Sequence, residues 1–433
     1  MHAVAMRLLK GGKDSKKPID GVKRPSMLLT LLRFNIILGF VPDYMHAVDL
    51  GIGKYFANMW ISHRGKPYSL PPHTVDKIDQ LMSKIKVPNQ LYRLSRSFQY
   101  RKWWTAREWE NWILYYSIPV LSAFPEFKQY LEHWTLLVSA LYLLLQKEVT
   151  RAEVQLADSL SSEFVEKTEI LYDGSNHLSQ SFINLTHADA ALQMVVDHRL
   201  EEMEIFTDDE SGEDIDHDSD RESDGSKDDE IPSKRSNECS TALNEVTKYH
   251  DYVVKERISD PRRIKDIYDS QLYMGFVEQL PLDYRHSFAT AAFNVDGIAV
   301  FECSDYSIWV IYIMINEIPP QARLKSPMIV GLWIGKEKPA MQVFLDKFVE
   351  FHNELTERGI ECVIKGETRM IRLYLLIAPV DTIARFVMNA TVQFSSEFGC
   401  DWCFQKGVQY LGSNRYPYEA NASMERDEAK HVV

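Results

Sequence analysis

Two apolar runs separated by a short polar segment constrain the fold more than any other part of this sequence. Residues 288–300 and 307–316 are rich in β-branched and aromatic side chains, and the polar residues 302–305 lie between them. Runs of this length and composition are typical of strands, and a short polar break is typical of a turn. The stretch 286–319 therefore predicts a hairpin whose two strands lie inside a sheet.

One carboxylate, Asp296, interrupts the first of these strands. Asp-Gly is a common hairpin-turn dipeptide, so residues 294–297 could form a tight turn, and the stretch by itself favours this interpretation. The alternative is that Asp296 lies within a buried strand. A buried carboxylate is costly unless it is paired, hydrogen-bonded or bound to a metal, so this alternative makes Asp296 a candidate ligand.

The residues after the hairpin predict two further strands and two helices. The pattern gives a strand over 328–335, a helix over 339–358, a strand over 372–380 that stops at Asp381, and a helix over 382–389. Strand, strand, strand, helix, strand, helix is the order of the ribonuclease-H-like fold. That fold needs carboxylates on two adjacent central strands to hold two Mg²⁺ ions for attack on a phosphodiester. In this order, Asp296 and Asp381 become candidate magnesium ligands.

The first 179 residues have the pattern of a mainly helical region. Thr150 and Glu153 form a capping box, and the apolar residues that follow recur with a helical period. Further upstream, Asp43, His46 and Asp49 recur every three residues, and on a helix they would share a face that could bind a metal or orient a backbone group. The alternative, which the sequence alone favours, is that Asp43 caps a helix and His46 is a core histidine.

Residues 93–107, RLSRSFQYRKWWTAR, interleave basic and aromatic side chains. This composition is typical of a surface that contacts single-stranded nucleic acid, where rings stack on bases and Arg and Lys contact phosphate. The aromatic series continues through Trp109, Trp112 and Tyr116 at helical spacing, which is typical of a buried helix face. We therefore expect the aromatic side chains to belong to a core.

An acidic segment divides the chain. Residues 201–230 contain sixteen Asp and Glu against two basic residues, a net charge of −14, whereas the whole chain of 433 residues carries −13. The rest of the chain is close to neutral, so the overall acidity does not exclude a nucleic-acid partner. Because the acidic segment is poor in apolar residues, we expect a disordered linker over 180–245 between a first region, 1–179, and a second, 246–433.

The composition indicates a folded chain without membrane spans. Apolar residues make up 45% of the sequence, which is enough for large cores. The most apolar runs, 27–40 and 134–146, are shorter than the roughly 20 residues that a membrane helix needs, so no membrane partner is expected. Five cysteines without a recognisable signal peptide indicate a reducing, intracellular compartment.

Cys400 and Cys403 form a CxxC motif. Two thiolates at this spacing could hold one Zn²⁺ as half of a tetrahedral site. The other two ligands are not adjacent in the sequence, and His46 and His431 are candidates. The alternative is a chance pair of thiols without a metal.

Several longer motifs occur together in both regions. The second region contains FNVDGIAVF, WVIYIMINEIPPQAR, GLWIGKEKP, PVDTIAR, EFGCDWC and NRYPYE, and the first contains GVKRPS, GFVPDYMHAVDLG and YRKWWTAREWENWILYYSIPVL. In combination they resemble the transposase encoded by CACTA (En/Spm-type) DNA transposons, and the matching pieces cover roughly 1–179 and 246–433.

This resemblance implies a DDE-type, ribonuclease-H-like nuclease that cuts and joins transposon DNA ends with Mg²⁺ or Mn²⁺ in the nucleus. The site residues that it implies are Asp296 and Asp381 as the first and second catalytic acids, Asp43 and His46 as a supporting DxxH motif, and Cys400 and Cys403 as the CxxC of the family.

The chain departs from the family in two ways. The order of the two regions is reversed, so we expect them to pack together as parts of one domain. The first region also ends near His177, before the stretch that carries the third acid of the family, and without that ligand a second metal ion is poorly held. We therefore expect strand cleavage and transfer to be defective. The alternative is a relic or domesticated protein that binds DNA or protein without cutting, and a homo-oligomer is compatible with both interpretations.

Overall fold

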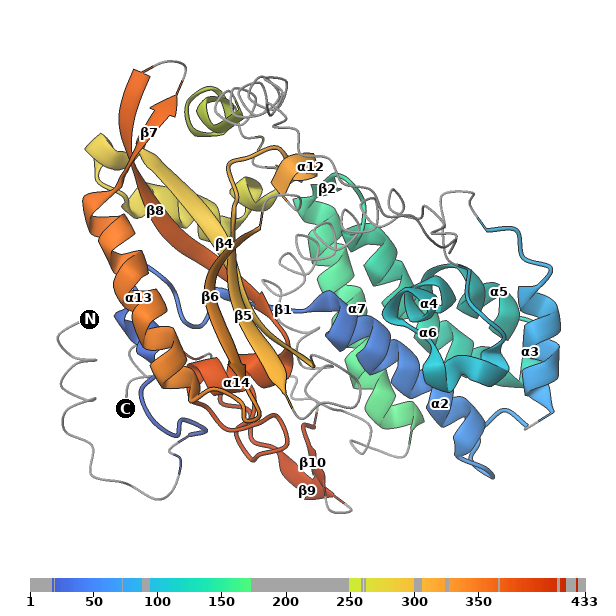
Figure 1. Cartoon of the computed structure of the whole chain (residues 1–433). Helices are drawn as coiled ribbons and strands as arrows, with labels where there is room; N and C mark the ends of the chain where they lie inside the picture. The colour runs from blue at the N-terminus through green and yellow to red at the C-terminus, as the bar shows by residue number, and fades with distance from the viewer. Residues whose placement is uncertain are drawn as a thin grey trace, which may run out of the picture.

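The structure is a computed structural model of the chain. It describes residues 20–71, 73–87, 94–172, 249–257, 262–299, 306–323, 327–364, 367–410 and 413–417, together with Pro18, Asp260 and Arg426. The linker predicted over 180–245 lies outside the described residues. Within them the protein is α/β, with a mixed sheet in the C-terminal half and helices in the N-terminal half (Figure 1).

Five strands form the main path of the sheet in the order β1-β8-β4-β5-β6. The strands are β1 (Phe40–Pro42), β4 (Phe288–Ala299), β5 (Ser307–Ile315), β6 (Met328–Gly335) and β8 (Glu367–Val380), and β7 (Ile360–Ile364) forms an antiparallel hairpin with β8. β5 is antiparallel to both β4 and β6, whereas β4, β8 and β1 run parallel. The predicted hairpin, the third strand and the strand ending before Asp381 are therefore all present.

Asp296 lies inside strand β4, so the prediction of a tight turn over 294–297 is wrong. It pairs with Val310 of β5, and the neighbouring Gly297 pairs with Trp309. The Trp309 indole covers Gly297 so closely that an added Cβ would lie 2.6 Å from its Cε2 atom. The glycine of this Asp-Gly pair therefore makes room for a ring on the adjacent strand instead of forming a turn.

Helices cover both faces of the sheet. On one face, α13 (Met341–Arg358), α14 (Thr382–Asn389) and η1 (Met27–Thr30) enclose a core with side chains such as Leu373 and Leu375 of β8. On the other face, η9 (Ile267–Asp269) and α11 (Gln271–Gln279) pack on Tyr374 and Leu376. Alternate residues of β8 thus enter opposite cores, as expected of a central strand buried on both sides.

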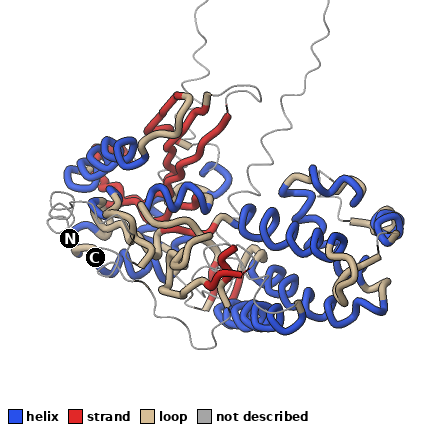
Figure 2. Tube along the Cα trace, turned by 90° about the horizontal axis from the view of Figure 1, so that it is seen from below, coloured by secondary structure: helices blue, strands red, loops and turns tan. Residues whose placement is uncertain are grey.

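The helices of the N-terminal half form a separate core beside the sheet (Figures 1 and 2). They are η2 (Met45–Gly53), α2 (Lys54–Ser62), α3 (Thr74–Met82), η3 (Phe98–Trp103), α4 (Ala106–Asn111), η4 (Trp112–Tyr116), α5 (Ser117–Leu121), η5 (Pro125–Phe127), α6 (Lys128–Leu144) and α7 (Arg151–Leu171). Helix α7 begins at the predicted capping box of Thr150 and Glu153. Trp60, Trp112 and Trp134 are fully buried in this core.

The remaining described elements are short. They are β2 (Val149–Thr150), η8 (Tyr252–Glu256), β3 (Arg263–Ile264), η10 (Leu282–Tyr284), α12 (Pro320–Arg323), β9 (Val408–Tyr410) and β10 (Ser413–Arg415). In the described part of the chain, no helix has both the length and the apolar character needed to cross a membrane.

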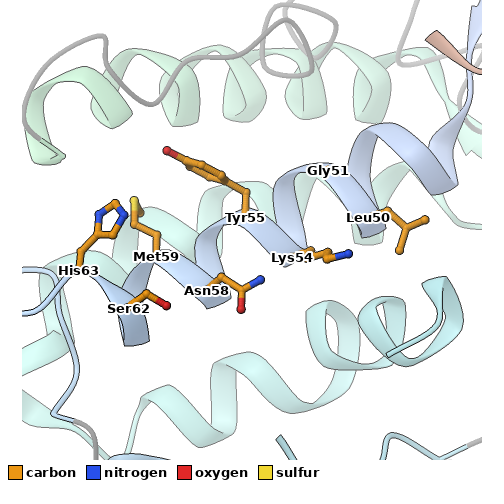
Figure 3. A pocket seen from close by; sticks show the side chains of 8 residues that line it. All are labelled: Leu50, Gly51, Lys54, Tyr55, Asn58, Met59, Ser62 and His63. Atoms are coloured by element: carbon orange, nitrogen blue, oxygen red, sulfur yellow. The ribbon is translucent and has the colours of Figure 1, made fainter. Parts of the chain in front are cut away.

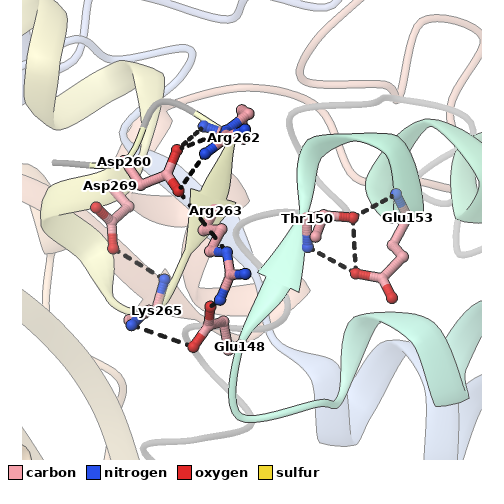
Figure 4. A network of polar contacts seen from close by, with 8 residues as sticks. All are labelled: Glu148, Thr150, Glu153, Asp260, Arg262, Arg263, Lys265 and Asp269. Carbon is pink, nitrogen blue, oxygen red and sulfur yellow. Dashed lines mark hydrogen bonds and ion pairs between the residues drawn. The ribbon is translucent and has the colours of Figure 1, made fainter.

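The two halves of the chain pack together, as the sequence predicted. Strand β1 from the N-terminal half adds to the sheet beside β8, and the Ser26 hydroxyl donates to the Met388 carbonyl over 2.6 Å. A second junction pairs β2 with β3. Beside it, the carboxylate of Glu148 contacts Arg263 and Lys265 (Figure 4).

Candidate functional site

Two of the predicted site residues follow directly after neighbouring parallel strands. The last residue pair between β1 and β8 is Pro42 with Val380, and Asp43 and Asp381 are the next residues of the two strands. Because parallel strands end at the same edge of a sheet, the two carboxylates come level at the carboxyl edge.

The third acid, Asp296, belongs to the strand on the other side of β8. Ala292 of β4 pairs with Ile377 of β8, and Asp296 and Asp381 each lie four residues beyond this pair along parallel strands. The three carboxylates thus come from three adjacent parallel strands, with Asp381 in the middle. Of the predicted residues, the structure gathers these three acids and His46 at one edge of the sheet.

Asp381 and Asp296 are held by their own local backbone. Asp381 caps α14, because its Oδ1 accepts a hydrogen bond from the Ala384 N–H. Asp296 has an exposed side chain, and its Oδ1 accepts from the N–H of Gly297 over 2.6 Å. The carboxylate of Asp296 therefore lies in a paired strand and still reaches solvent.

Asp43 and His46 form a doubly bonded pair. The Asp43 Oδ1 accepts from the His46 backbone N–H over 3.0 Å, and its Oδ2 lies 2.6 Å from the imidazole Nδ1. The predicted capping role of Asp43 is confirmed, but His46 is 45% exposed and is not a core histidine. The predicted common face with Asp49 is also wrong: η2 is a π-helix, whose wider turn changes the spacing, and Asp49 is buried.

The pKa of His46 shows that the four groups act on one another. The hydrogen bond to Asp43 is the largest cause and raises this pKa above 6.5, and partial burial opposes it. The negative charges of Asp43, Asp381 and Asp296 then raise it further. The neighbouring carboxylates thus stabilise the protonated form of His46 relative to that of a free histidine.

The carboxyl edge offers two carboxylates, those of Asp296 and Asp381, that could hold a partly hydrated Mg²⁺. Within the described ranges, no three His, Cys, Asp or Glu side chains are arranged to hold a metal ion together. Mg²⁺ does not need such a cage, because it keeps several waters and binds one or two carboxylates together with substrate phosphates. Asp296 and Asp381 supply two such carboxylates, whereas both oxygens of Asp43 are engaged by His46.

Among the described residues, no third His, Cys, Asp or Glu is arranged to hold a metal ion with the CxxC pair. Cys400 and Cys403 are both buried, and their mutual hydrogen bond and their burial raise the pKa of the Cys403 thiol. The guanidinium of Arg426 donates to the backbone carbonyls of both cysteines, over 2.9 and 3.2 Å. His46 is bonded to Asp43 instead, and His431 lies outside the described residues.

A buried ion pair that the sequence analysis missed links the CxxC loop to α14. The Nε of Arg385 lies 2.7 Å from Oδ2 of Asp401, and both side chains are buried. Burial raises the pKa of Asp401 to about 6, and the charge of Arg385 opposes this rise. Arg385 belongs to α14, the helix that Asp381 caps. The ion pair with Asp401 therefore fixes this helix, and with it Asp381, against the CxxC loop. An Arg within the apolar face of a short helix is the signal that could have revealed it.

Comparisons with protein-family models, with curated proteins and with solved structures found no match for this chain.

Proposed function

We propose that the chain is a transposase-like protein of the DDE type that acts on the DNA ends of a transposon and is defective in strand cleavage. The carboxyl edge described above carries this proposal, with Asp381 and Asp43 just past the ends of β8 and β1, and Asp296 within the adjacent parallel strand β4. The strand order and directions also support a ribonuclease-H-like fold, in which β4, β5, β6, β8 and β1 take the five strand positions.

The proposed chemistry needs few residues. Asp296 and Asp381 would hold Mg²⁺ or Mn²⁺, which supplies charge stabilisation to a phosphodiester undergoing in-line attack. The imidazolium of His46 would offset part of the negative charge at the edge and orient Asp43, so that anionic DNA can approach. Because the proposed substrate is DNA, we place the protein in the nucleus.

The proposed defect follows from the number of ligands. A two-metal mechanism needs a third carboxylate to fix the second ion beside the leaving group. Asp43 lies at the same carboxyl edge as Asp296 and Asp381, but its bonds to His46 favour a supporting role. A second candidate function is therefore a DNA- or protein-binding relic without catalysis, and the engagement of both Asp43 oxygens by His46 favours it.

The test combines metal binding with strand cleavage by the purified full chain. We expect weak Mg²⁺ binding in calorimetry, lost in Asp296→Ala and kept in Asp346→Ala, which removes an exposed carboxylate from α13. We expect no nicking or joining of DNA that carries the terminal repeats of a CACTA-type transposon. Specific nicking that Asp296→Ala abolishes would overturn the proposed defect, and equal Mg²⁺ binding by both variants would overturn the site.

A further inference from the structure

Two large aromatic side chains are exposed side by side on η3. Trp103 is 68% exposed and Tyr100 is 52% exposed, and their ring centroids lie 6.4 Å apart. Residues three apart in a 3₁₀-helix are eclipsed, so both rings project from the same side. Their neighbours Phe98 and Trp104 are buried in the helical core, which shows that η3 divides the aromatic residues between the core and the surface.

An exposed lysine lies between these rings. Lys102 lies between the two aromatic residues and is exposed, and residues 94–107 include no Asp or Glu. The acids that follow, Glu108 and Glu110, are buried and paired with Arg96 and Arg107. Arg101 is buried, so Lys102 is the exposed cation that these ion pairs leave in the segment. An exposed cation between two exposed rings, in a segment whose acids are buried in ion pairs, is complementary to a nucleic-acid strand and not to a basic partner.

A groove on α2 adjoins η3. The Nε of Arg101, within η3, donates to Oδ1 of Asn58 over 3.0 Å. Asn58 lines a groove of about 460 Å³, and Figure 3 shows Lys54, Asn58 and Ser62 following one another along the helix. The full lining consists of Leu50, Gly51, Lys54, Tyr55, Asn58, Met59, Ser62 and His63.

The helix that carries the groove leads back to the carboxyl edge of the sheet. Helix α2 continues directly from η2, and η2 contains His46, which is bonded to Asp43. One continuous helical segment thus runs from the three acids, past Lys54, to the contact with η3.

We propose that Tyr100 and Trp103 form a stacking site for unpaired bases of single-stranded DNA whose backbone follows the α2 groove. The choice of DNA rests on the proposed function. Rings stack on any unpaired base, whereas bases in a duplex are already stacked on one another, so the site selects single strands without reading sequence. Lys54 supplies a positive charge for a phosphate along the groove.

The test measures anisotropy of a fluorescein-labelled 20-nucleotide strand of mixed sequence, and of its duplex, with the full chain. We expect tighter binding of the single strand, weakened about tenfold by Trp103→Ala and by Tyr100→Ala, and largely retained in Trp103→Phe. Lys54→Gln should lower the slope of log affinity against log salt by about 0.7. Trp333→Ala removes a tryptophan that is 41% exposed on β6 and is the matched control.

The outcomes separate this site from the proposed cutting site. Asp296→Asn should lose Mg²⁺ binding and keep single-strand binding, so a chain that fails every cleavage test can still confirm the stacking site. The proposal is overturned if the full chain binds duplex as tightly as single strand, or if Trp103→Ala and Trp333→Ala bind the single strand equally well.

Discussion

At the scale of residues, the candidate site depends on which oxygen atoms are already engaged. Asp43 uses one oxygen for the His46 backbone and the other for its ring, whereas Asp381 uses Oδ1 to cap a helix. Three carboxylates at one edge of a sheet are therefore not equivalent. This difference is why we assign ion binding to Asp296 and Asp381, and a supporting role to Asp43.

The pKa of His46 provides a direct measurement of this arrangement. We expect Asp43→Asn to lower the pKa, because the hydrogen bond to Asp43 is its largest cause. Because the pKa of His46 is higher in the folded protein than in the unfolded chain, its protonation adds to the free energy of unfolding. This contribution is complete below pH 6.5 and is lost as the pH rises through the pKa of the folded protein. The contribution is small because the side chain is half-exposed.

An NMR titration of the histidine ring signals checks this expectation. Addition of Mg²⁺ should also lower the pKa of His46, because an ion held by Asp296 and Asp381 cancels charges that now raise it. An unchanged His46 titration in Asp43→Asn would contradict the electrostatic account of the site.

At the scale of elements, a strand of three residues decides how the chain closes its sheet. Strand β1 extends the sheet beyond β8, and its first residue, Phe40, is fully buried between the sheet and Phe34, with ring centroids 5.8 Å apart. A strand this short has few backbone hydrogen bonds. Its place therefore depends mainly on the burial of side chains.

Phe40→Ala should destabilise the protein by about 3–5 kcal/mol, because it removes a large ring from a filled core. The matched control is Leu38→Ala, two residues earlier and 39% exposed, which should change the free energy of unfolding by about 0.5 kcal/mol or less. Urea unfolding followed by tryptophan fluorescence measures both variants. Equal effects of the two substitutions would show that β1 does not lie in the sheet as described.

At the scale of the whole molecule, the two halves are joined at two separate places. One is the β1–β8 pairing with the nearby contact between Ser26 and Met388, and the other is the β2–β3 pairing with Glu148 between Arg263 and Lys265. The first junction buries many apolar residues in the core of the sheet. The second buries a smaller apolar cluster that includes Val149 and Ile264, with the exposed contacts of Glu148 beside it. We expect the first to supply most of the binding free energy.

Residues 1–172 and 246–433, expressed as two separate chains, should therefore associate into one particle. Size-exclusion chromatography of the mixture should give a 1:1 complex, and Phe40→Asp should abolish it because a charge would enter the core. Glu148→Gln affects only the exposed contacts of the second junction and should leave the complex intact. Independent migration of the unmodified halves would contradict the packing of the two halves.

The sequence by itself determined the elements whose residues repeat with a local period. The β4–β5 hairpin, strand β6, helix α13 and the start of α7 lie where their patterns predicted, because side-chain alternation and capping are set by near neighbours along the chain. It also selected Asp296 and Asp381 from their places in that order of elements.

Only the tertiary structure decided the features that depend on distant residues. Phe40–Pro42 forms a strand because its backbone pairs with the free edge of β8. Gly297 lies in a strand and not in a turn because the Trp309 ring packs over it. Trp103 became a surface residue while Trp104 became a core residue, although the two are adjacent in the sequence. Pairing register and burial depend on which surfaces meet after folding, and no local period encodes that information.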